Sequence, residues 1–155
     1  MISIESPDQP EVRELIRRGD EFGLAMYPAA SYYGLPLEQL LAPGVTFFVA
    51  RDPHAVGTAA LVDRGDGTAE LKRMFVAVEA RNRGIASELL RAVEVAAVAS
   101  GVRLLQLETG PKQPEAIALY EKFGYRAIEN FGPYVGDADS YCMEKLLTPG
   151  TSASE

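Results

Sequence analysis

The chain has 155 residues, of which 47% are hydrophobic and 24% are charged, as in an ordinary globular protein. Its formal net charge of −7 argues against a nucleic-acid partner, because binding to duplex nucleic acid requires a basic face. His54 and Cys142 are the only histidine and the only cysteine. An intramolecular disulfide is therefore impossible, and we expect no metal site, since a His/Cys site has almost nothing to be built from.

No apolar run in the sequence is long enough to span a bilayer, and the first residues lack the basic and apolar regions of a signal peptide. We therefore expect a cytoplasmic protein without a membrane partner. The length fits one domain with a substantial core, which we assign to residues 1–147. Residues 148–155, rich in Pro, Gly, Ser and Thr, are expected to form a frayed tail.

The first half of the chain is predicted to open with helices and to continue as an antiparallel meander. Apolar residues recur at helical spacing after Pro10, and β-forming runs separated by turn residues follow from Val45 onward. The predicted elements are a strand over 2–4, a helix over 10–23, an aromatic loop over 27–36, a short helix over 37–41, and strands over 45–50, 55–62 and 70–78.

The second half is predicted to consist of βα units. A helix over 83–100 carries one apolar stripe, with Glu88, Arg91 and Glu94 turned to solvent. The further predicted elements are strands over 102–107, 125–128 and 140–146 and a helix over 113–123. This order predicts an α/β fold of the α+β kind: a mixed sheet in which an antiparallel meander is followed by βα units, with helices on both faces.

The junction between the strand at 70–78 and the helix at 83–100 reads Arg81, Asn82, Arg83, Gly84, Ile85, Ala86. A helix that begins here presents unpaired N–H groups and the positive end of its dipole, flanked by two arginines. Small residues at 84 and 86 let the main chain approach a ligand closely. These features predict an anion site, such as one for a phosphate group. The alternative is a solvated turn in which Gly84 and Ala86 serve close helix–sheet packing.

A second informative stretch is Ala-Ile-Ala-Leu-Tyr-Glu-Lys-Phe-Gly-Tyr, at residues 116–125. Together with Arg81-x-x-Gly84-x-Ala86, it resembles the GNAT superfamily of acyl-CoA-dependent N-acetyltransferases, whose phosphate-loop pattern is Arg or Gln, two residues, Gly, one residue, and Gly or Ala. The resemblance covers the chain from about Glu70 to Tyr125. It implies the GNAT acyl-CoA N-acyltransferase fold and a function as an N-acetyltransferase.

The resemblance implies that acetyl-CoA is the co-substrate and that the main chain of residues 81–86 surrounds its diphosphate. It further implies that the backbones of Val76 and Val78 pair with the pantetheine arm as an added strand would. An N–H near Val76 would polarise the thioester carbonyl, while both valine side chains are expected in the core. Many members of the family carry Asn where this chain has Gln113, whose side chain would reach one methylene further towards the cofactor.

Two residues are the predicted catalytic groups. Tyr120 matches the family's tyrosine that protonates the departing thiolate, and an unperturbed phenol stays protonated at neutral pH. It can also be one more member of the apolar stripe of its helix. Glu70 occupies the strand position where histone-acetylating members carry their glutamate base, and strand alternation predicts that it shares a face with Lys72, Met74 and Val76. Glu70 can equally form a surface pair with Lys72.

Glu108, at the end of the next strand, is the alternative base. On the acceptor side the family's opening segments cover the amine, which points to Tyr27, Tyr32 and Tyr33 as candidates for holding a cationic or aromatic amine. Tyr134 and Ser140 are similarly placed after the last helix, and the tyrosines can equally form a packed lid. Cys142 alternates within the closing strand and is expected to be a small buried side chain.

The sequence thus predicts direct transfer of an acetyl group from acetyl-CoA to a primary amine of a small molecule or peptide in a ternary complex. A non-catalytic acyl-CoA-binding or sensing module on the same fold is the alternative, and a longer acyl donor is another. The acceptor remains open, and a homodimer is possible because dimers are common in the family.

Overall fold

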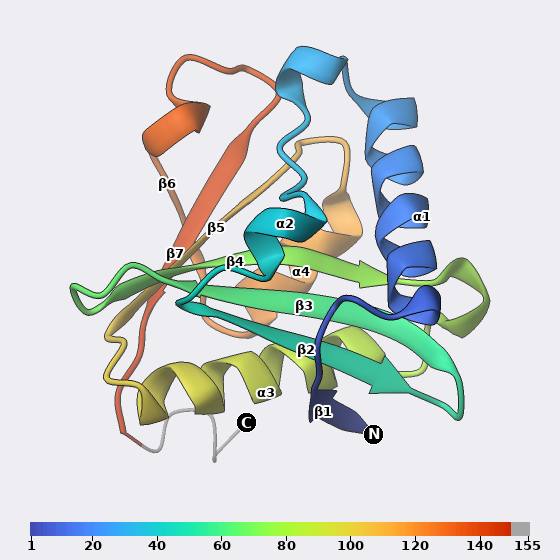
Figure 1. The fold of residues 1–155 in the computed structure, drawn as a ribbon. Helices are drawn as coiled ribbons and strands as arrows, with labels where there is room; N and C mark the ends of the chain where they lie inside the picture. Colours follow the sequence, from blue (N-terminus) through green and yellow to red (C-terminus); the bar gives the residue numbers. More distant parts are fainter. Residues whose placement is uncertain (150–155) are drawn as a thin grey trace.

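The computed structural model describes residues 1–149, and residues 150–155 of the predicted tail lie outside this range. Within this range four α-helices and three short 3-10 helices accompany seven strands, which form one sheet (Figure 1). The strands are β1 (Ile2–Ile4), β2 (Val45–Arg51), β3 (Ala55–Asp63), β4 (Thr68–Val76), β5 (Leu104–Thr109), β6 (Arg126–Ile128) and β7 (Tyr141–Leu146). The α-helices are α1 (Pro10–Met26), α2 (Leu37–Leu40), α3 (Ile85–Ala99) and α4 (Pro114–Lys122), and the short 3-10 helices are η1 (Ala29–Ser31), η2 (Val78–Ala80) and η3 (Gly132–Tyr134).

The strand order is β1-β2-β3-β4-β5-β7-β6. Within the described residues, β4 and β5 are the parallel neighbours and the other neighbouring pairs are antiparallel. The predicted mixed sheet, with a meander followed by βα units, is therefore confirmed. The assignment of residues 1–147 to a single domain remains a prediction.

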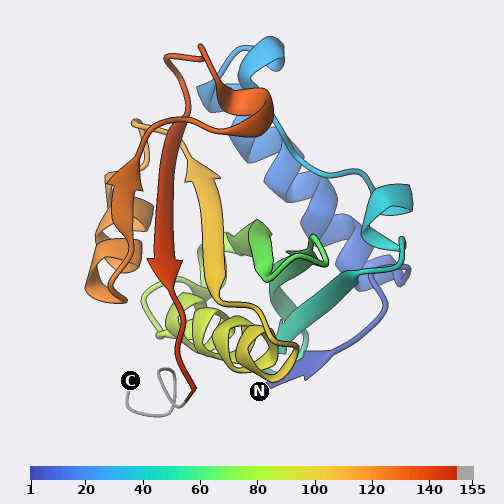
Figure 2. The ribbon, with the colours of Figure 1, turned by 90° about the vertical axis from the view of Figure 1, so that its left-hand side faces the viewer.

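The helices lie on both faces of the sheet, and each face has its own core. Helices α1 and α2 pack on β2 and β3 through a small cluster that includes Val12, Leu40 and Phe47. Helices α3 and α4 cover the opposite face through a larger cluster that includes Leu89 and Phe123. Figure 2 shows α1 and α3 on opposite sides of the sheet. The apolar stripes that predicted these helices are the faces that they bury.

The parallel strands β4 and β5 separate part-way along. They pair from Thr68 with Leu104 up to Leu71 with Leu107, although β4 continues to Val76. Beyond this point β5 pairs only with β7, and Figure 1 shows β5, β7 and β6 diverging from β2, β3 and β4. The separation leaves one side of the second half of β4 without a strand partner.

A bulge at Arg73 accompanies this separation. Lys72 lies opposite Ala60 and Phe75 opposite Thr58, so two residues of β4 face the single residue Ala59 of β3. Arg73 has a left-handed φ of 56°.

The bulge reverses the side-chain alternation, because one extra residue exchanges the two faces. Met74 and Val76 pack against the core under α3, whereas Glu70 and Lys72 lie on the face of α1. The prediction that all four residues share one face is therefore wrong.

Two further predictions require correction. Val78 lies outside β4, in η2, and its side chain is 67% exposed rather than part of the core. Glu94 was predicted to face solvent but is fully buried. Its carboxylate accepts hydrogen bonds from Lys145 Nζ at 2.9 Å and from the Tyr125 hydroxyl at 2.7 Å. These partners come from β7 and from the residue directly before β6, so the periodicity of α3 alone does not reveal them.

Candidate active site

The loop between η2 and α3 forms an anion-binding main-chain surface. Asn82 and Gly84 are both left-handed, with φ of 65° and 76°. Gly84 is the N-cap of α3, and no side chain caps the helix. Within the described chain, the six main-chain N–H groups from Asn82 to Ser87 donate to no protein acceptor. We call residues 81–87 the anion loop, because such a run of free donors at a helix start favours an anionic ligand.

The conformation of Gly84 separates the two interpretations of this loop. A Cβ placed on Gly84 would meet no heavy atom within 4 Å. Close helix–sheet packing therefore does not require glycine here, whereas the left-handed backbone does. Helix α3 and the sheet approach each other closely at Gly57 of β3 instead, where an added Cβ would come within 3.1 Å of the Leu89 side chain.

The two arginines of the anion loop differ in their partners. Arg81 donates from Nε to the main-chain oxygen of Val76 at 3.0 Å, and its guanidinium lies 5.1 Å from the ring centroid of Phe22. Arg83 forms an exposed ion pair with Asp52 at 3.2 Å. Both are exposed, so an incoming anion can exchange with these partners at little cost.

The side chains around the anion loop divide between core and surface. The Ile85 side chain is buried beneath α3, so only its main chain faces the loop. Gln113 is the N-cap residue of α4, and its side chain forms no capping hydrogen bond. Its amide is half-buried.

On the α1 face, a group of polar side chains lies where β4 and β5 separate. We call it the acceptor-side cluster: Glu70, Lys72, Glu108, Tyr134 and Asp137. The buried Tyr134 hydroxyl donates to Glu70 Oε2 at 2.6 Å and accepts from Lys72 Nζ at 2.7 Å.

Glu70 is surrounded by cations. In addition to Tyr134, it has Arg64 at 3.5 Å and Lys72 at 3.8 Å. The predicted pairing of Glu70 with Lys72 is thus present. The Glu70 carboxylate is therefore already bound by a phenol and lies within ion-pair distance of two cations.

Glu108 lies in a different environment. Burial raises the pKa of Glu108 to about 7, and a hydrogen bond from Ser140 and the charge of Lys72 only partly oppose the shift. The Ser140 hydroxyl donates to its Oε2 at 2.9 Å. Burial also lowers the pKa of Lys72. The pKa of Glu108 therefore lies where a base working at neutral pH needs it.

The position of Tyr120 is compatible with both interpretations made from the sequence, a core residue of its helix and a tyrosine that protonates the thiolate. Its ring is buried in the core under α3 and α4, in edge contact with Tyr125 at 5.8 Å between centroids. Within residues 1–149 its hydroxyl makes no hydrogen bond, yet no fully buried side-chain polar atom lacks a partner. The oxygen must therefore reach accessible space. Burial and the nearby charge of Glu108 raise its pKa above the usual value for tyrosine.

Two loops far apart in sequence meet above the acceptor-side cluster. Asp137 accepts from the Tyr33 hydroxyl at 2.6 Å and from Ser31 Oγ at 3.0 Å. The Tyr33 ring stands edge-on to Tyr134, with 4.7 Å between centroids. Figure 1 shows the loop before α2 beside the loop before β7. Asp137 thus connects these two loops. It was not among the residues predicted from the sequence, where the only signals for it were the adjacent turn residue Gly136 and the nearby acidic residue Asp139.

The other two candidate tyrosines are held by structural contacts. Tyr27 is buried, its ring lies where a Cβ of Gly110 would be, and its hydroxyl accepts from the Lys112 N–H at 2.9 Å. Tyr32 donates to Asp20 at 2.6 Å. Cys142 is 1% exposed, as predicted for a small buried side chain.

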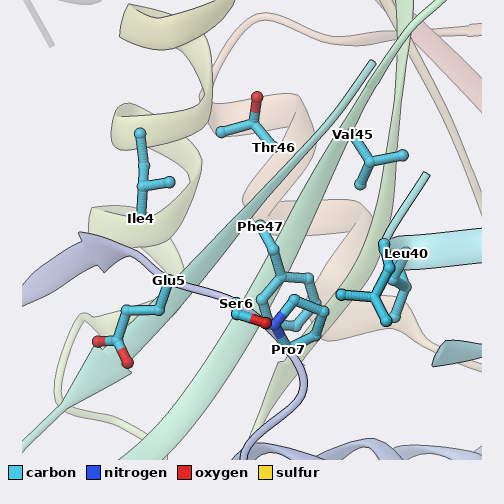
Figure 3. Close-up of a pocket in the computed structure, with 9 residues that line it drawn as sticks. Ile4, Glu5, Ser6, Pro7, Leu40, Val45, Thr46 and Phe47 are labelled. Carbon is cyan, nitrogen blue, oxygen red and sulfur yellow. The ribbon is translucent and has the colours of Figure 1, made fainter. Parts of the chain in front are cut away.

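A surface hollow of about 360 Å³ lies elsewhere, between the chain after β1, strand β2 and helix α2. In Figure 3, Leu40, Phe47 and Pro7 line it, and none of its labelled residues belongs to the anion loop or the acceptor-side cluster. Among residues 1–149, no group of three or more His, Cys, Asp or Glu side chains is arranged to hold a metal ion. In the same part of the chain, no helix has both the length and the apolarity needed to cross a membrane.

A splayed sheet with an anion-binding helix start beside it is the architecture of an acyl-CoA-dependent acyltransferase. The model of the acetyltransferase (GNAT) family matches residues 10–125 of this chain. The chain therefore belongs to the GNAT family of acetyltransferases, and the predicted membership, fold and enzyme class are confirmed.

Characterised relatives and solved structures agree with this membership. The chain is 43% identical over 148 residues to a protein named IAA acetyltransferase from Azospirillum brasilense, covering 94% of this chain and 97% of that protein. A Klebsiella pneumoniae structure assigned as an acyl-CoA N-acyltransferase superposes with a TM-score of 0.80 at 32% identity, covering 96% and 97% of the two chains. The PaiA N-acetyltransferase of Thermoplasma acidophilum, solved with coenzyme A, has the same fold, with a TM-score of 0.72 at 20% identity over 94% and 99% of the chains.

Proposed function

We propose that this protein transfers an acetyl group from acetyl-CoA to an amine of a small molecule or peptide by direct attack in a ternary complex. The observation that carries the proposal is the anion loop, whose six free N–H groups adjoin a strand edge that has lost its partner. One site is suited to a diphosphate and the other to the extended amide chain of pantetheine. The residues present therefore fit the cofactor.

In this proposal the main chain of the anion loop binds the diphosphate, and Arg81 and Arg83 add positive charge. The segment Met74–Val76, after the bulge, pairs with the pantetheine arm, and an N–H near Val76 polarises the thioester carbonyl. The Val76 oxygen also accepts from Arg81 Nε at 3.0 Å, and because a carbonyl oxygen has two lone pairs it can accept from a pantetheine amide as well. Because Val78 lies in η2, we do not extend the strand pairing to it.

Glu108 serves as the base. It takes a proton from the acceptor's ammonium, directly or through a water, and the neutral amine then attacks the thioester carbon. As the C–S bond breaks, Tyr120 gives its hydroxyl proton to the departing thiolate, and the second proton lost by the nitrogen passes through water to the Tyr120 oxygen. The two roles suit their environments, because burial keeps the pKa of Glu108 near neutrality and keeps Tyr120 protonated. Glu70 instead orders Tyr134 and Lys72 around the acceptor.

The acceptor is sought with a turnover screen in which release of the CoA thiol is followed with amino acids, polyamines, aminoglycosides and peptide N-termini. IAA belongs in the panel because the Azospirillum relative is named for it. We expect an acceptor-dependent thiol signal that Glu108→Gln and Tyr120→Phe reduce strongly while CoA binding is retained. CoA binding without acetyl-CoA turnover by any acceptor would instead favour the non-catalytic module.

A further inference from the structure

Arg73 combines an unfavourable backbone with an almost fully buried charge. Its φ of 56° lies in the left-handed region that residues with a Cβ avoid. Its side chain is only 6% exposed. A residue in this state persists only where its surroundings hold it.

Arg73 is held through both its side chain and its main chain. Its guanidinium donates from Nε to the main-chain oxygen of Leu35 at 2.9 Å, and its Nη1 forms an ion pair with Asp20 at 2.7 Å. Nη1 also donates to the Tyr32 hydroxyl at 3.0 Å. From β3, the buried Thr58 hydroxyl donates to the Arg73 main-chain oxygen at 2.8 Å.

These contacts fix the bulge itself. The bulge turns Met74 and Val76 towards the α3 core and coincides with the end of pairing between β4 and β5. A guanidinium is suited to this task because its rigid fork can satisfy several acceptors at once. A lysine in its place could not bind Asp20 and the Leu35 oxygen in the same geometry.

We propose that Arg73 is a positioning residue, which holds the segment Met74–Val76 in the geometry that binds the acyl donor. This inference rests on the proposed function. Because the same guanidinium binds Tyr32 and Leu35, it also connects that segment to the loop that covers the acceptor side. Arg73 acts through the backbone and does not itself touch the reacting atoms.

Two substitutions separate positioning from simple stabilisation. Arg73→Ala removes the guanidinium and keeps the unfavourable φ, whereas Arg73→Gly removes the guanidinium but adopts that φ readily. Arg51→Ala is the matched control: its guanidinium joins β2 to Glu5 and Glu11 at 2.9 Å each, away from the bulge. For each protein we would measure melting temperature, kcat/KM for acetyl-CoA, and amide hydrogen exchange of residues 73–76 with and without CoA.

We expect both Arg73 variants to lose roughly 10- to 100-fold in kcat/KM, since small misplacements of reacting groups have effects of this size. Exchange of residues 73–76 should become faster in both, although Arg73→Gly should melt closer to the wild type than Arg73→Ala. Arg51→Ala should melt lower than the wild type while its kcat/KM stays within about 2-fold, because its contacts lie outside the site.

Arg73→Gly with wild-type kcat/KM and wild-type exchange would overturn the assignment. If neither Arg73 variant folds, Tyr32→Phe decides. It keeps the ion pair with Asp20 and removes one guanidinium acceptor, and an unchanged kcat/KM in Tyr32→Phe would count against positioning. Failure of the proposed function gives a different result, in which CoA leaves the exchange of residues 73–76 unchanged even in the wild type.

Discussion

The anion loop and the acceptor-side cluster are built on opposite principles. The anion loop offers main-chain N–H groups that have no partner in the described chain, on a backbone shaped by left-handed Asn82 and Gly84. In the acceptor-side cluster, side chains from several strands and loops already bond to one another, as Tyr134 does to Glu70 and Lys72.

This difference indicates which half of the site suits a ligand common to many enzymes and which half discriminates between ligands. Main-chain donors recognise any ligand with a suitably placed anion, so the loop suits a cofactor shared by many enzymes. A bonded network of side chains must be matched or rearranged by each ligand, and it therefore discriminates between acceptors. The following substitutions test this division.

The largest effect is expected for Glu108→Gln, which removes the proposed base from the acceptor side. We expect kcat to fall by about 10²–10⁴, the usual contribution of a general base, with acetyl-CoA binding unchanged. In the wild type, activity should rise with pH through about 7, where Glu108 loses its proton, and this dependence should vanish in the variant. Glu70→Gln is the control; a larger loss there than in Glu108→Gln would reverse the assignment of the two carboxylates.

Tyr120→Phe removes the proposed general acid. We expect kcat to fall by about 10², measured by thiol release at saturating acetyl-CoA. The matched control is Tyr125→Phe, the same change in the adjoining ring, whose hydroxyl bonds to buried Glu94. That variant should melt at a lower temperature and keep its kcat, and equal losses of kcat would argue that Tyr120 is only a core residue.

Gly84→Val acts on the anion loop alone. A β-branched residue at φ of 76° costs about 1–2 kcal/mol and occupies space in front of the free N–H groups. We expect CoA affinity, measured by calorimetry, to fall by about 10-fold or more. Gly101→Val provides the comparison, because Gly101 is also left-handed, has open space around its Cβ, and lies after the other end of α3. Gly101→Val should lower the stability of the protein and leave its affinity for CoA unchanged.

Asp137→Asn weakens the connection between the two acceptor-side loops. The amide retains one oxygen and cannot accept from both Tyr33 and Ser31 as the carboxylate does. Loss of one such bond predicts a rise of about 5-fold in KM for the acceptor, with KM for acetyl-CoA unchanged. A parallel rise in both constants would show that the two halves are not independent.

The smallest effect concerns stability and pH. Because burial raises the pKa of Glu108 to about 7 from 4.5, the folded protein binds this proton more tightly than the unfolded chain does. Stability should therefore decline as pH rises from about 4.5 to about 7, with the charges of Lys72, Glu70 and Asp137 setting the size of the decline. Melting curves should place Glu108→Gln above the wild type at pH 8 and close to it at pH 5. A gap of the same size at both values would contradict this linkage.

Much of the fold was predictable, because helix and strand periodicities are local. The stripe of α3 and the turns of the meander lie where the sequence placed them, within a few residues. The face of Glu70 relative to Met74 was not predictable. It depends on a bulge at Arg73, a residue type that gives no signal for a left-handed backbone and is held there by Asp20, Tyr32 and Leu35. Burial of Glu94 likewise depends on Lys145, which is 51 residues away.

The sequence by itself determined the anion loop, because its function depends on consecutive backbone groups and on one glycine within a strand–loop–helix unit. The tertiary structure decided the surroundings of the two candidate carboxylates. Glu70 and Glu108 both sit in strands, and only the cations Arg64 and Lys72 beside one and the burial of the other separate them. A pKa is set by neighbours in space, and those neighbours come from distant parts of the chain.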